Sequence, residues 1–450
     1  MLRLHDTAQG KVVDFVPRQP GKVSMYVCGP TVYDYPHIGH GRQVLLYDVL
    51  WRYLEWSGLE VTFVSNITDI DDNIINKAGE EGRSTEEVVA TYEAAWWDAL
   101  DRLGVRRPNE APHATAYVER MIELIGELAA AGFAYTTDDG VYFTAENLPG
   151  YGLLAGQALE SLRAGGGDRA VVGTDKRSPF DFALWKLSKP GEPAWDAPWG
   201  AGRPGWHTEC VVMSLDLLGE GFDLHAGGLD LKFPHHENER AQAVALGREF
   251  SRHWMHHAFV ELAGVKMSKS LNNFTSLTDM LEQTGDGRTY RLLVLQSHYR
   301  SPMEVTGDTI EQATNRLAGL DAFARRFASA RGAPADADAL SQFRQAMDDD
   351  LDTPKALALV SDLVRAANAA ADAGDDVDAK AAAVFEVTTV LGLDLRSEGD
   401  EIDTDSQALV DRRDAARAAK DYATSDALRD ELKALGWNVE DTPEGTRIHR

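Results

Sequence analysis

The sequence predicts an α/β protein that has a parallel sheet and is followed by a helical C-terminal part. Three observations support this fold class. A strand, a helix and a second strand follow one another early in the chain, strand-like segments return after an interruption, and an Ala-rich helical pattern runs from about residue 308. Because 450 residues exceed what one hydrophobic core usually serves, several structural units are expected.

The first unit begins with a short apolar run over residues 23–27, which a Gly-Pro pair ends. Apolar residues then recur at helical spacing over 39–54, and a second apolar run covers 61–64. A unit of this kind implies parallel strands joined by a right-handed crossover. Ligands of such sheets bind beyond the carboxyl ends of the strands, where Cys28 and the stretch 66–72 are expected.

An interruption separates this unit from later strand-like segments near 222–225 and 258–260. It contains a helical pattern over 118–128 and then a stretch rich in Gly, Pro and Trp, so we interpret it as an insertion. The expected domains are a parallel-sheet domain over 1–115 and 205–305, the insertion over 116–204, a helical bundle over 306–396 and a small C-terminal domain over 405–450.

Composition restricts the possible partners and the compartment. The net charge of −27 argues against a broad surface that binds polyanions, so a nucleic acid would have to bind local basic patches. No apolar run approaches the roughly 18 residues of a membrane helix, and the N-terminal residues 1–6 lack a basic segment leading into an apolar one. We therefore expect a cytoplasmic protein without a membrane partner. Its two cysteines, Cys28 and Cys210, are more typical of buried thiols or metal ligands than of a disulfide.

Two histidines stand where the first helix is predicted to begin. A helix start offers free backbone N–H groups and a positive dipole end, which suit a phosphate. Gly39 allows close approach of the backbone, and His37 and His40, three residues apart, share one face. Taken alone, the pair is more typical of surface or capping histidines.

A second group of polar residues follows the last strand-like segment. Lys266, Ser268, Lys269 and Ser270 place two ammonium groups and two hydroxyls on one predicted loop, which suits a triphosphate whose charge grows in a transition state. Taken alone, such a loop is more often a solvated charged one.

A third group could bind a metal ion. Residues 233–239 are predicted to open a helix on which His235 and Glu239, four residues apart, face the same way. With Cys28 and Cys210 they form a Cys₂-His-Glu set that suits tetrahedral zinc. The two-histidine spacing of metalloprotease helices is missing. The alternative is a capped surface helix and two core thiols.

The histidine and lysine groups, in this order along the chain, resemble the two signature motifs of class I aminoacyl-tRNA synthetases. Segments 26–31, 205–210 and 233–239 resemble the cysteinyl-tRNA synthetase branch of that class, and the resemblance extends over residues 2–450. It implies a Rossmann-like catalytic domain with an inserted connective subdomain, an α-helical bundle and an anticodon-binding domain. Asn272 stands where the family usually has glycine, a departure that removes no functional group.

The resemblance implies that one Zn²⁺ per chain is held by Cys28, Cys210, His235 and Glu239. Serine differs from cysteine by one atom, and a pocket that measures shape alone separates such near-isosteres poorly. A soft thiolate bonded to zinc is a contact that the harder hydroxyl of serine cannot match.

The resemblance also implies the partners ATP with Mg²⁺, L-cysteine and tRNA(Cys), and a two-step reaction through cysteinyl-adenylate. His37 and His40 would stabilise the phosphates, while Lys266 and Lys269 would stabilise the departing pyrophosphate. The implied substrate and ATP contacts are Gly29, Thr31, Gly39, Thr68, Trp206, His225, Ser268, Lys269 and Ser270. Without the resemblance, Thr68, Trp206 and His225 are more typical of a strand-end hydroxyl, a core indole and a core histidine.

The predicted tRNA contacts lie on the helix that opens the C-terminal domain: Arg412, Arg413, Arg417 and Lys420. The alternative for these residues is a solvated helix face. Two other functions stay open, a ligase that joins cysteine to an amino sugar in mycothiol synthesis and a catalytically silent relative that binds RNA or metal. The C-terminal basic helix argues against the first, and the complete histidine and lysine groups argue against the second. A monomer is expected.

Overall fold

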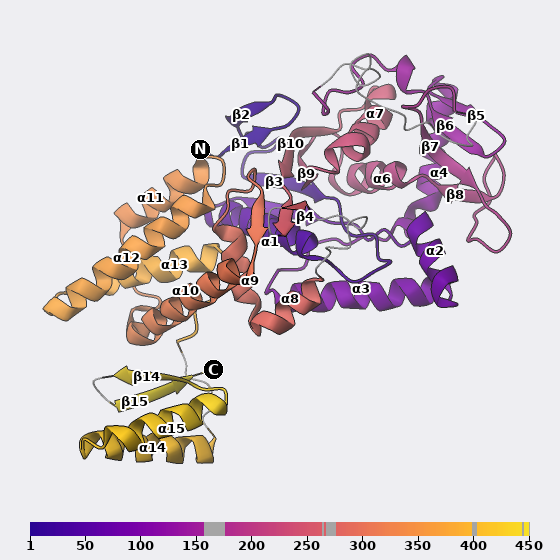
Figure 1. Cartoon of the computed structure of the whole chain (residues 1–450). Helices are drawn as coiled ribbons and strands as arrows, with labels where there is room; N and C mark the ends of the chain where they lie inside the picture. The colour runs from indigo at the N-terminus through magenta and orange to yellow at the C-terminus, as the bar shows by residue number, and fades with distance from the viewer. Residues whose placement is uncertain (157–175, 263–264, 267–275, 398–402, 443–444, 450) are drawn as a thin grey trace.

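The computed structural model describes residues 1–156, 176–262, 265–266, 276–397, 403–442 and 445–449. Figure 1 shows a parallel sheet at the centre, with the insertion on one side, the helical bundle on the other and the C-terminal domain beyond the bundle. Of the predicted lysine loop, Lys266 belongs to β12 (Val265–Lys266), whereas Ser268, Lys269, Ser270 and Asn272 lie outside the described residues. None of the helices in the described ranges is long and apolar enough to cross a membrane.

The central sheet confirms the predicted fold class. Its strands run in the order β10 (Ser251–His257), β9 (Phe222–Gly228), β3 (Lys22–Val27) and β4 (Glu60–Val64), and every pair is parallel. α1 (Ile38–Trp56) connects β3 to β4, as the strand–helix–strand pattern predicts. Every residue of β9 is buried, which is typical of a parallel strand covered on both faces.

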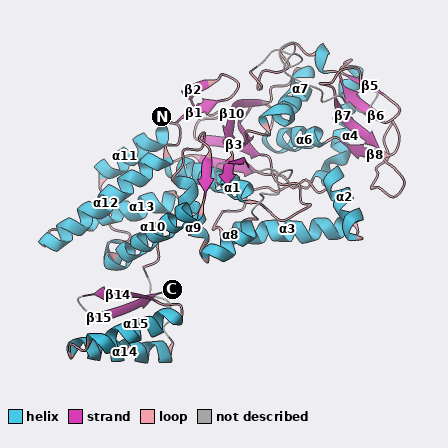
Figure 2. Cartoon of the chain, viewed as in Figure 1, coloured by secondary structure: helices cyan, strands magenta, loops and turns pink. Residues whose placement is uncertain are grey.

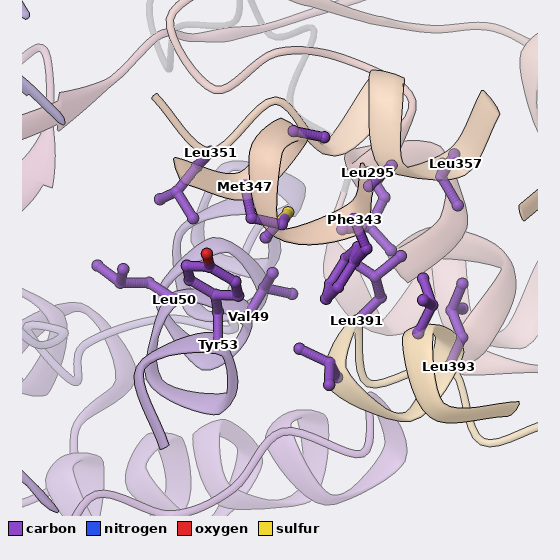
Figure 3. Close-up of a cluster of buried hydrophobic side chains, with 14 of the residues drawn as sticks. Val49, Leu50, Tyr53, Leu295, Phe343, Met347, Leu351, Leu357, Leu391 and Leu393 are labelled. Carbon is purple, nitrogen blue, oxygen red and sulfur yellow. The ribbon is translucent and has the colours of Figure 1, made fainter. Parts of the chain in front are cut away.

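Helix α1 is packed between this sheet and the bundle. Figure 3 shows Val49, Leu50 and Tyr53 of α1 against side chains of the helical bundle and of the last residue of α9 (Gly287–Leu295). The partners that Figure 3 labels are Leu295, Phe343, Met347, Leu351, Leu357, Leu391 and Leu393. The Tyr53 hydroxyl also donates to Asp348 Oδ1 at 2.7 Å. Packing along its length therefore holds the start of α1 in a defined place beyond the carboxyl end of β3.

The insertion carries a second, antiparallel sheet. After η1 (Ala114–Tyr117) and α4 (Val118–Ala130) come β5 (Ala134–Thr136), β6 (Gly140–Phe143), η2 (Ala145–Asn147), β7 (Phe182–Leu187) and β8 (Gly202–Pro204), and the chain returns to the first sheet through α6 (Trp206–Leu218). Lys186 and Arg203 of this sheet both form ion pairs with Asp72, the first residue of α2 (Asp72–Glu81). These pairs tie the insertion to the stretch that follows β4.

The remaining elements of the first 305 residues surround the parallel sheet. They are the hairpin β1 (Arg3–Asp6) and β2 (Lys11–Asp14), α3 (Thr85–Arg102), the turn η3 (Lys232–His236), α7 (Glu237–Ala245), β11 (Val260–Leu262), α8 (Leu277–Thr284), α9 (Gly287–Leu295) and β13 (Met303–Val305). β11 pairs with β12 and β13 in a small sheet of its own.

The Ala-rich part folds into α-helices, as predicted. The bundle consists of α10 (Gly307–Arg326), η5 (Ala328–Ala330), α11 (Ala337–Asp348), α12 (Thr353–Ala373) and α13 (Asp378–Val390). Asp352 caps α12 by accepting from the backbone of Lys355, and Pro354 occupies the first turn, where a missing N–H costs nothing. Figure 2 shows this part as helices without strands between them.

The C-terminal domain has a separate small core. α14 (Thr404–Ala418) and α15 (Tyr422–Ala434) pack on the hairpin β14 (Asn438–Thr442) and β15 (Gly445–His449). Its buried apolar residues are Leu409, Val410, Leu428, Leu432, Trp437, Val439 and Ile448. An ion pair between Arg325 Nη2 and Glu440 Oε1, 2.6 Å apart, connects it with α10.

Candidate functional site

A cavity of about 500 Å³ opens at the carboxyl ends of β3, β9 and β10, the edge that the sequence predicts for ligands. Its lining includes these predicted site residues: Cys28, Gly29, Thr31, His37, Gly39, His40 and Trp206. Asp71, from the stretch 66–72 expected at this edge, also lines the cavity, whereas the sequence prediction missed Gln43, Asp230 and His257. The cavity therefore joins the beginning of α1 to the buried cysteine at the end of β3.

The four predicted metal ligands meet behind this cavity, and we call them the sulfur cluster. Cys28 Sγ lies 3.7 Å from Cys210 Sγ and 3.6 Å from Glu239 Oε1. His235 Nε2 lies 3.6 Å from Cys210 Sγ and 2.7 Å from Glu239 Oε1. All four side chains are buried, and one donor atom from each lies within 4.8 Å of the others.

These distances test whether the sulfur cluster fits a metal ion. In tetrahedral zinc, bonds of about 2.3 Å to sulfur and about 2.0–2.2 Å to nitrogen or oxygen place neighbouring ligand atoms about 3.4–3.8 Å apart. Three of the four measured distances fall in that range. The fourth, between His235 and Glu239, is a hydrogen bond of 2.7 Å that would have to lengthen. The donor set and its spacing therefore suit a tetrahedral metal.

The local secondary structure positions each donor of the sulfur cluster. Cys28 directly follows β3, and Cys210 lies in the second turn of α6. The predicted helix over 233–239 differs from the structure, because Phe233 has extended dihedrals (φ −145°, ψ 129°) and α7 begins at Glu237. A wider turn over Lys232–His236 precedes it, and His235 still reaches Glu239 in the first turn of α7.

Burial and mutual contact decide the charge of these groups. Burial raises the pKa of the Cys28 thiol well above its usual value, and Cys210 and Glu239 add to the effect. Burial acts in the same direction on Cys210, but hydrogen bonds with Cys28 and His235 lower the pKa of its thiol to about 6. For His235, burial favours the neutral form, yet Glu239 and Cys210 raise its pKa to about 10. A proton on His235 thus balances buried anions, and a bound metal would release such a proton.

A second layer of residues surrounds the sulfur cluster. His225, on β9, is fully buried; its Nε2 lies 2.7 Å from Glu239 Oε2, and its ring stacks on Tyr26 with centroids 5.3 Å apart. Trp206 is 37% exposed and stacks on His235 at 3.9 Å between centroids, so it forms a wall of the cavity rather than part of a core. His225 and Trp206, which the sequence analysis gives as substrate contacts, thus lie against the metal donors.

Gly29, Thr31 and Thr68 lie where the loops after β3 and β4 meet. A Cβ atom on Gly29 would lie 1.7 Å from the carbonyl oxygen of Asn66, so the close approach of the two loops requires glycine. Thr31 and Thr68 pair through a parallel backbone bridge. The buried Thr68 hydroxyl donates to Glu209 Oε2 at 2.8 Å, which keeps it in the interior beside Cys210.

The histidine pair closes the first turn of α1. Each ring accepts from the other residue's backbone N–H at 3.2 Å, and the two rings stack with centroids 3.6 Å apart. Burial lowers the pKa of His37 to about 4, and burial, His37 and His257 lower the pKa of His40 well below its usual value. Both imidazoles are therefore neutral at physiological pH. A Cβ at Gly39 would lie 2.8 Å from the His37 ring, so the stack requires glycine there.

The described residues on the C-terminal side of the lysine loop return to the histidine pair. Ser276 forms a backbone bridge with His37, and the backbone N–H of Leu277 donates to the carbonyl of Pro36 at 2.8 Å. The segment that follows the lysine loop therefore contacts the histidine pair, although the two groups lie far apart in the sequence.

One predicted tRNA contact needs correction. Arg413 is buried inside the C-terminal domain and donates to Asp441 Oδ1 at 2.8 Å and to the Thr446 hydroxyl at 2.5 Å. Arg417, one helical turn later, also pairs with Asp441. Arg413 therefore ties α14 to the terminal hairpin and is not free for a ligand. Arg412 and Lys420 are exposed.

Several residues near the sulfur cluster were not found by sequence reasoning. His236 Nε2 lies 3.3 Å from Cys28 Sγ, and His236 Nδ1 lies 2.8 Å from His256 Nε2. His256 and His257 end β10, so their position at the carboxyl end of a parallel strand was a usable signal. Contact between His236 and Cys28 depends on the turn before α7, which the sequence pattern did not predict.

Family comparisons match almost the whole chain. The family described as "tRNA synthetases class I (C) catalytic domain" matches residues 14–315, the DALR domain matches 342–396, and the "Cysteinyl-tRNA ligase anticodon binding domain" matches 399–448.

Curated relatives match over nearly their full length. The "Cysteine--tRNA ligase" of Halorhodospira halophila is 46% identical over 100% of both chains. The protein of the same name from Thermotoga maritima is 44% identical over 99% of each chain, and that from Streptomyces avermitilis is 43% identical over 99% of this chain and 98% of its own.

Solved structures share the fold at low identity. Mycobacterium tuberculosis methionyl-tRNA synthetase in complex with methionyl-adenylate aligns with a TM-score of 0.60 and 16% identity, covering 82% of this chain and 90% of that one. Agrobacterium radiobacter LeuRS, in a ternary complex with tRNA and LeuAMS, aligns with a TM-score of 0.62 and 12% identity, covering 85% and 84%.

Proposed function

This chain belongs to the cysteine–tRNA ligases, class I aminoacyl-tRNA synthetases that join cysteine to tRNA, and we propose that it selects and activates cysteine at the carboxyl edge of the β10-β9-β3-β4 sheet. The observation that carries this placement is the sulfur cluster behind a cavity whose other end is the start of α1. One cavity thus offers a metal-binding set and a phosphate-binding helix start.

The metal of this site is proposed to be one Zn²⁺, held by Cys28, Cys210, His235 and Glu239. The ligand-atom spacing supports the assignment, because three distances of 3.6–3.7 Å suit tetrahedral coordination. Two soft thiolates also favour zinc over oxygen-seeking cations such as Mg²⁺. When bound, zinc supplies a Lewis-acid contact for a substrate thiolate, which a serine hydroxyl matches poorly.

Residues around the cluster are proposed to hold cysteine itself. Trp206 covers His235 and faces the cavity, so its indole would close over the small side chain of the substrate. Thr68 and His225 are buried and hydrogen bonded within the protein, and they are proposed to shape this pocket. The backbone of Gly29 and Thr31 lines the cavity at the same place.

The ATP site is proposed to lie at the beginning of α1, with Mg²⁺ accompanying the nucleotide. His37 and His40 are neutral, so they can donate an N–H to phosphate oxygens without carrying a charge of their own. The positive dipole end of α1 favours the same anion. Lys266, Lys269, Ser268 and Ser270 are proposed to stabilise the departing pyrophosphate, and the bridge between Ser276 and His37 supports a place for this loop beside the phosphates.

For tRNA, we propose that residues 405–450 bind the anticodon end. Arg412, Arg417 and Lys420 remain candidates for phosphate contacts, whereas Arg413 serves the domain interior. The match of residues 399–448 to the anticodon binding domain argues against a ligase for an amino sugar. We further propose that the chain acts as a monomer in the cytoplasm, where tRNA and ATP are available.

The test is cysteine-dependent exchange of labelled pyrophosphate into ATP, followed by charging of tRNA(Cys) with the zinc-loaded protein. Serine is expected to support neither reaction at a comparable rate. A C-terminal truncation that keeps residues 1–396 is expected to retain exchange and its zinc while losing most of the charging activity. A truncated protein that charges tRNA as fast as the full chain would overturn the proposed role of the C-terminal domain.

A further inference from the structure

A chain of hydrogen bonds leads from the sulfur cluster to the N-terminal hairpin. His236 Nε2 lies 3.3 Å from Cys28 Sγ, and His236 Nδ1 lies 2.8 Å from His256 Nε2. His256 Nδ1 in turn lies 2.7 Å from the hydroxyl oxygen of Thr7, in the turn that follows β1. His236 and His256 are buried, and Thr7 is half-buried. Neither His236 nor His256 is among the described residues that line the cavity.

We propose that His236, His256 and Thr7 form a relay that orients the Cys28 sulfur and tunes its bond to the metal. In this role the three side chains are positioning residues, because they act through Cys28 and touch neither the cavity nor a substrate in it. The inference rests on the proposed zinc site and adds to it the residues that set the strength of one metal–sulfur bond.

The chemistry of the chain permits one direction of donation. A metal-bound thiolate can accept but not donate, so His236 must carry its proton on Nε2. A neutral His236 then accepts at Nδ1 from the Nε2–H of His256, and His256 accepts at Nδ1 from the Thr7 hydroxyl. Every link has one donor and one acceptor in this arrangement. The thiolate therefore determines the tautomers of both histidines, and Thr7, three links from the sulfur, supplies the last donor of the chain.

A hydrogen bond to a metal thiolate changes how much charge the sulfur gives to the metal. Partners of this kind fix the orientation of a ligand, and their loss typically costs about 10–100-fold in metal affinity. For Cys28, the effect would extend to substrate selection, because the metal must still attract the thiolate of cysteine.

The geometry also permits an alternative role for His236, that of a metal ligand. Cys28, His225, His236 and Glu239 also place one donor atom each within 4.8 Å of the others. In that arrangement His236 would be a ligand and would donate from Nδ1 to His256. We favour the relay because the Cys28–Cys210 set offers two thiolates, which bind zinc more strongly than one thiolate and a second imidazole.

The experiment uses the full chain with zinc bound and compares Thr7→Val with Thr7→Ser. Valine keeps the shape and removes the hydroxyl, whereas serine keeps the hydroxyl. Zinc affinity is measured by competition with a chelator, and the cobalt-substituted proteins are compared by their sulfur-to-cobalt absorption band. We expect Thr7→Val to weaken zinc binding and to shift the band. The loss of affinity should be no more than about tenfold, because Thr7 lies farther from the metal than a residue that bonds directly to a ligand. Thr7→Ser should restore both values.

Two further variants test the inner link. His236→Ala removes the donor to Cys28 and should weaken zinc about 10–100-fold while one zinc per chain still binds at saturating metal. His236→Gln places an amide N–H near the former Nε2 and should recover part of the affinity. The ratio of kcat/KM for cysteine over serine in pyrophosphate exchange should fall in the same order as zinc affinity. Thermal unfolding of each protein separates these effects from general instability.

The relay is overturned if Thr7→Val matches the unmodified protein in zinc affinity and in the cobalt spectrum. It is also overturned if His236→Ala binds no zinc at saturation, since His236 would then be a ligand. Failure of the zinc site itself gives a different result, because the unmodified protein would then hold no zinc at all.

Discussion

Two clusters of ionisable residues, each with a buried centre, lie along the path of α1, and they differ in whether every member is paired with a group of fixed opposite charge. The Asp48 cluster comprises Asp48, Arg52, Arg106 and Arg291. Asp48 accepts from Arg291 at 2.6 Å and from Arg52 at 2.8 Å, and Arg291 donates further to the carbonyls of Leu103 and Gly104. Each charged group there has a protein partner of opposite character.

The sulfur cluster, beyond the start of the same helix, is not matched in this way. Two thiols and a carboxylate are buried against the imidazoles of His225, His235 and His236. The pKa of Cys210, lowered to about 6, and the pKa of His235, raised to about 10, reflect the strong interaction of these groups. Buried groups whose charges depend on one another's protonation are typical of sites that bind a ligand, whereas a carboxylate paired with arginines is typical of structural support. The difference teaches that the pairing of buried charges distinguishes a site from a scaffold better than their number.

The largest expected effect is loss of the metal from the sulfur cluster. Cys210→Ser removes one soft ligand, so zinc content by elemental analysis should fall from about one per chain toward zero. In the metal-free proteins, the same change should alter the free energy of unfolding by about 1 kcal/mol or less, because the thiolate it removes is costly to bury. Full zinc occupancy in the variant would contradict the ligand assignment and with it the contrast between the clusters.

The Asp48 cluster should respond in the opposite way. Arg291→Met leaves Asp48 buried beside fewer cations, and removal of one member of a buried pair typically costs about 3–5 kcal/mol. Urea unfolding of the metal-free proteins should show this loss, while zinc affinity of the folded variant stays close to that of the unmodified chain. Arg344→Met, at an arginine more exposed than Arg291, serves as the matched control and should cost far less. A stability unchanged by Arg291→Met would mean that the matched cluster is not structural support.

A substitution in the lysine loop should slow the chemical step without affecting the sulfur cluster. Lys269→Ala should slow cysteine-dependent pyrophosphate exchange by about 10²–10³, because the charge that it stabilises develops mainly in the transition state. Cysteine binding and zinc content should change little, since both depend on the sulfur cluster. An exchange rate equal to that of the unmodified enzyme would show that the loop is a solvated one.

The smallest effects are expected in the C-terminal domain, where buried and exposed arginines lie side by side. Arg413→Met should lower the thermal stability of this domain, because it removes the ties to Asp441 and Thr446. Arg412→Ala should leave stability within about 0.5 kcal/mol, yet weaken tRNA charging more at low salt than at high salt. Circular dichroism and charging assays at two salt concentrations check both. If tRNA charging by Arg413→Met and by Arg412→Ala depended equally on salt, the proposed difference between a structural arginine and a phosphate-binding arginine would be wrong.

Sequence reasoning succeeded where local pattern and chemistry coincide. The strand–helix–strand unit, the Ala-rich helices and the gathering of Cys28, Cys210, His235 and Glu239 all follow from periodicity, spacing or family motifs. It failed at Arg413, because helical spacing shows which residues share a face but not whether that face meets solvent or a hairpin. It also missed the turn over Lys232–His236, which replaces the first turn of the expected helix.

The sequence by itself determined the fold class, the order of the domains' elements and the kinds of atoms available at the sheet edge. These depend on hydrophobic periodicity and on side-chain chemistry, both of which are local properties of the chain. The tertiary structure alone decided which buried histidines contact Cys28, which arginines pair with Asp48 or Asp441, and that Thr7 lies beside His256. Such contacts join residues up to 249 positions apart, and no local pattern encodes a distance that arises from the packing of separate elements.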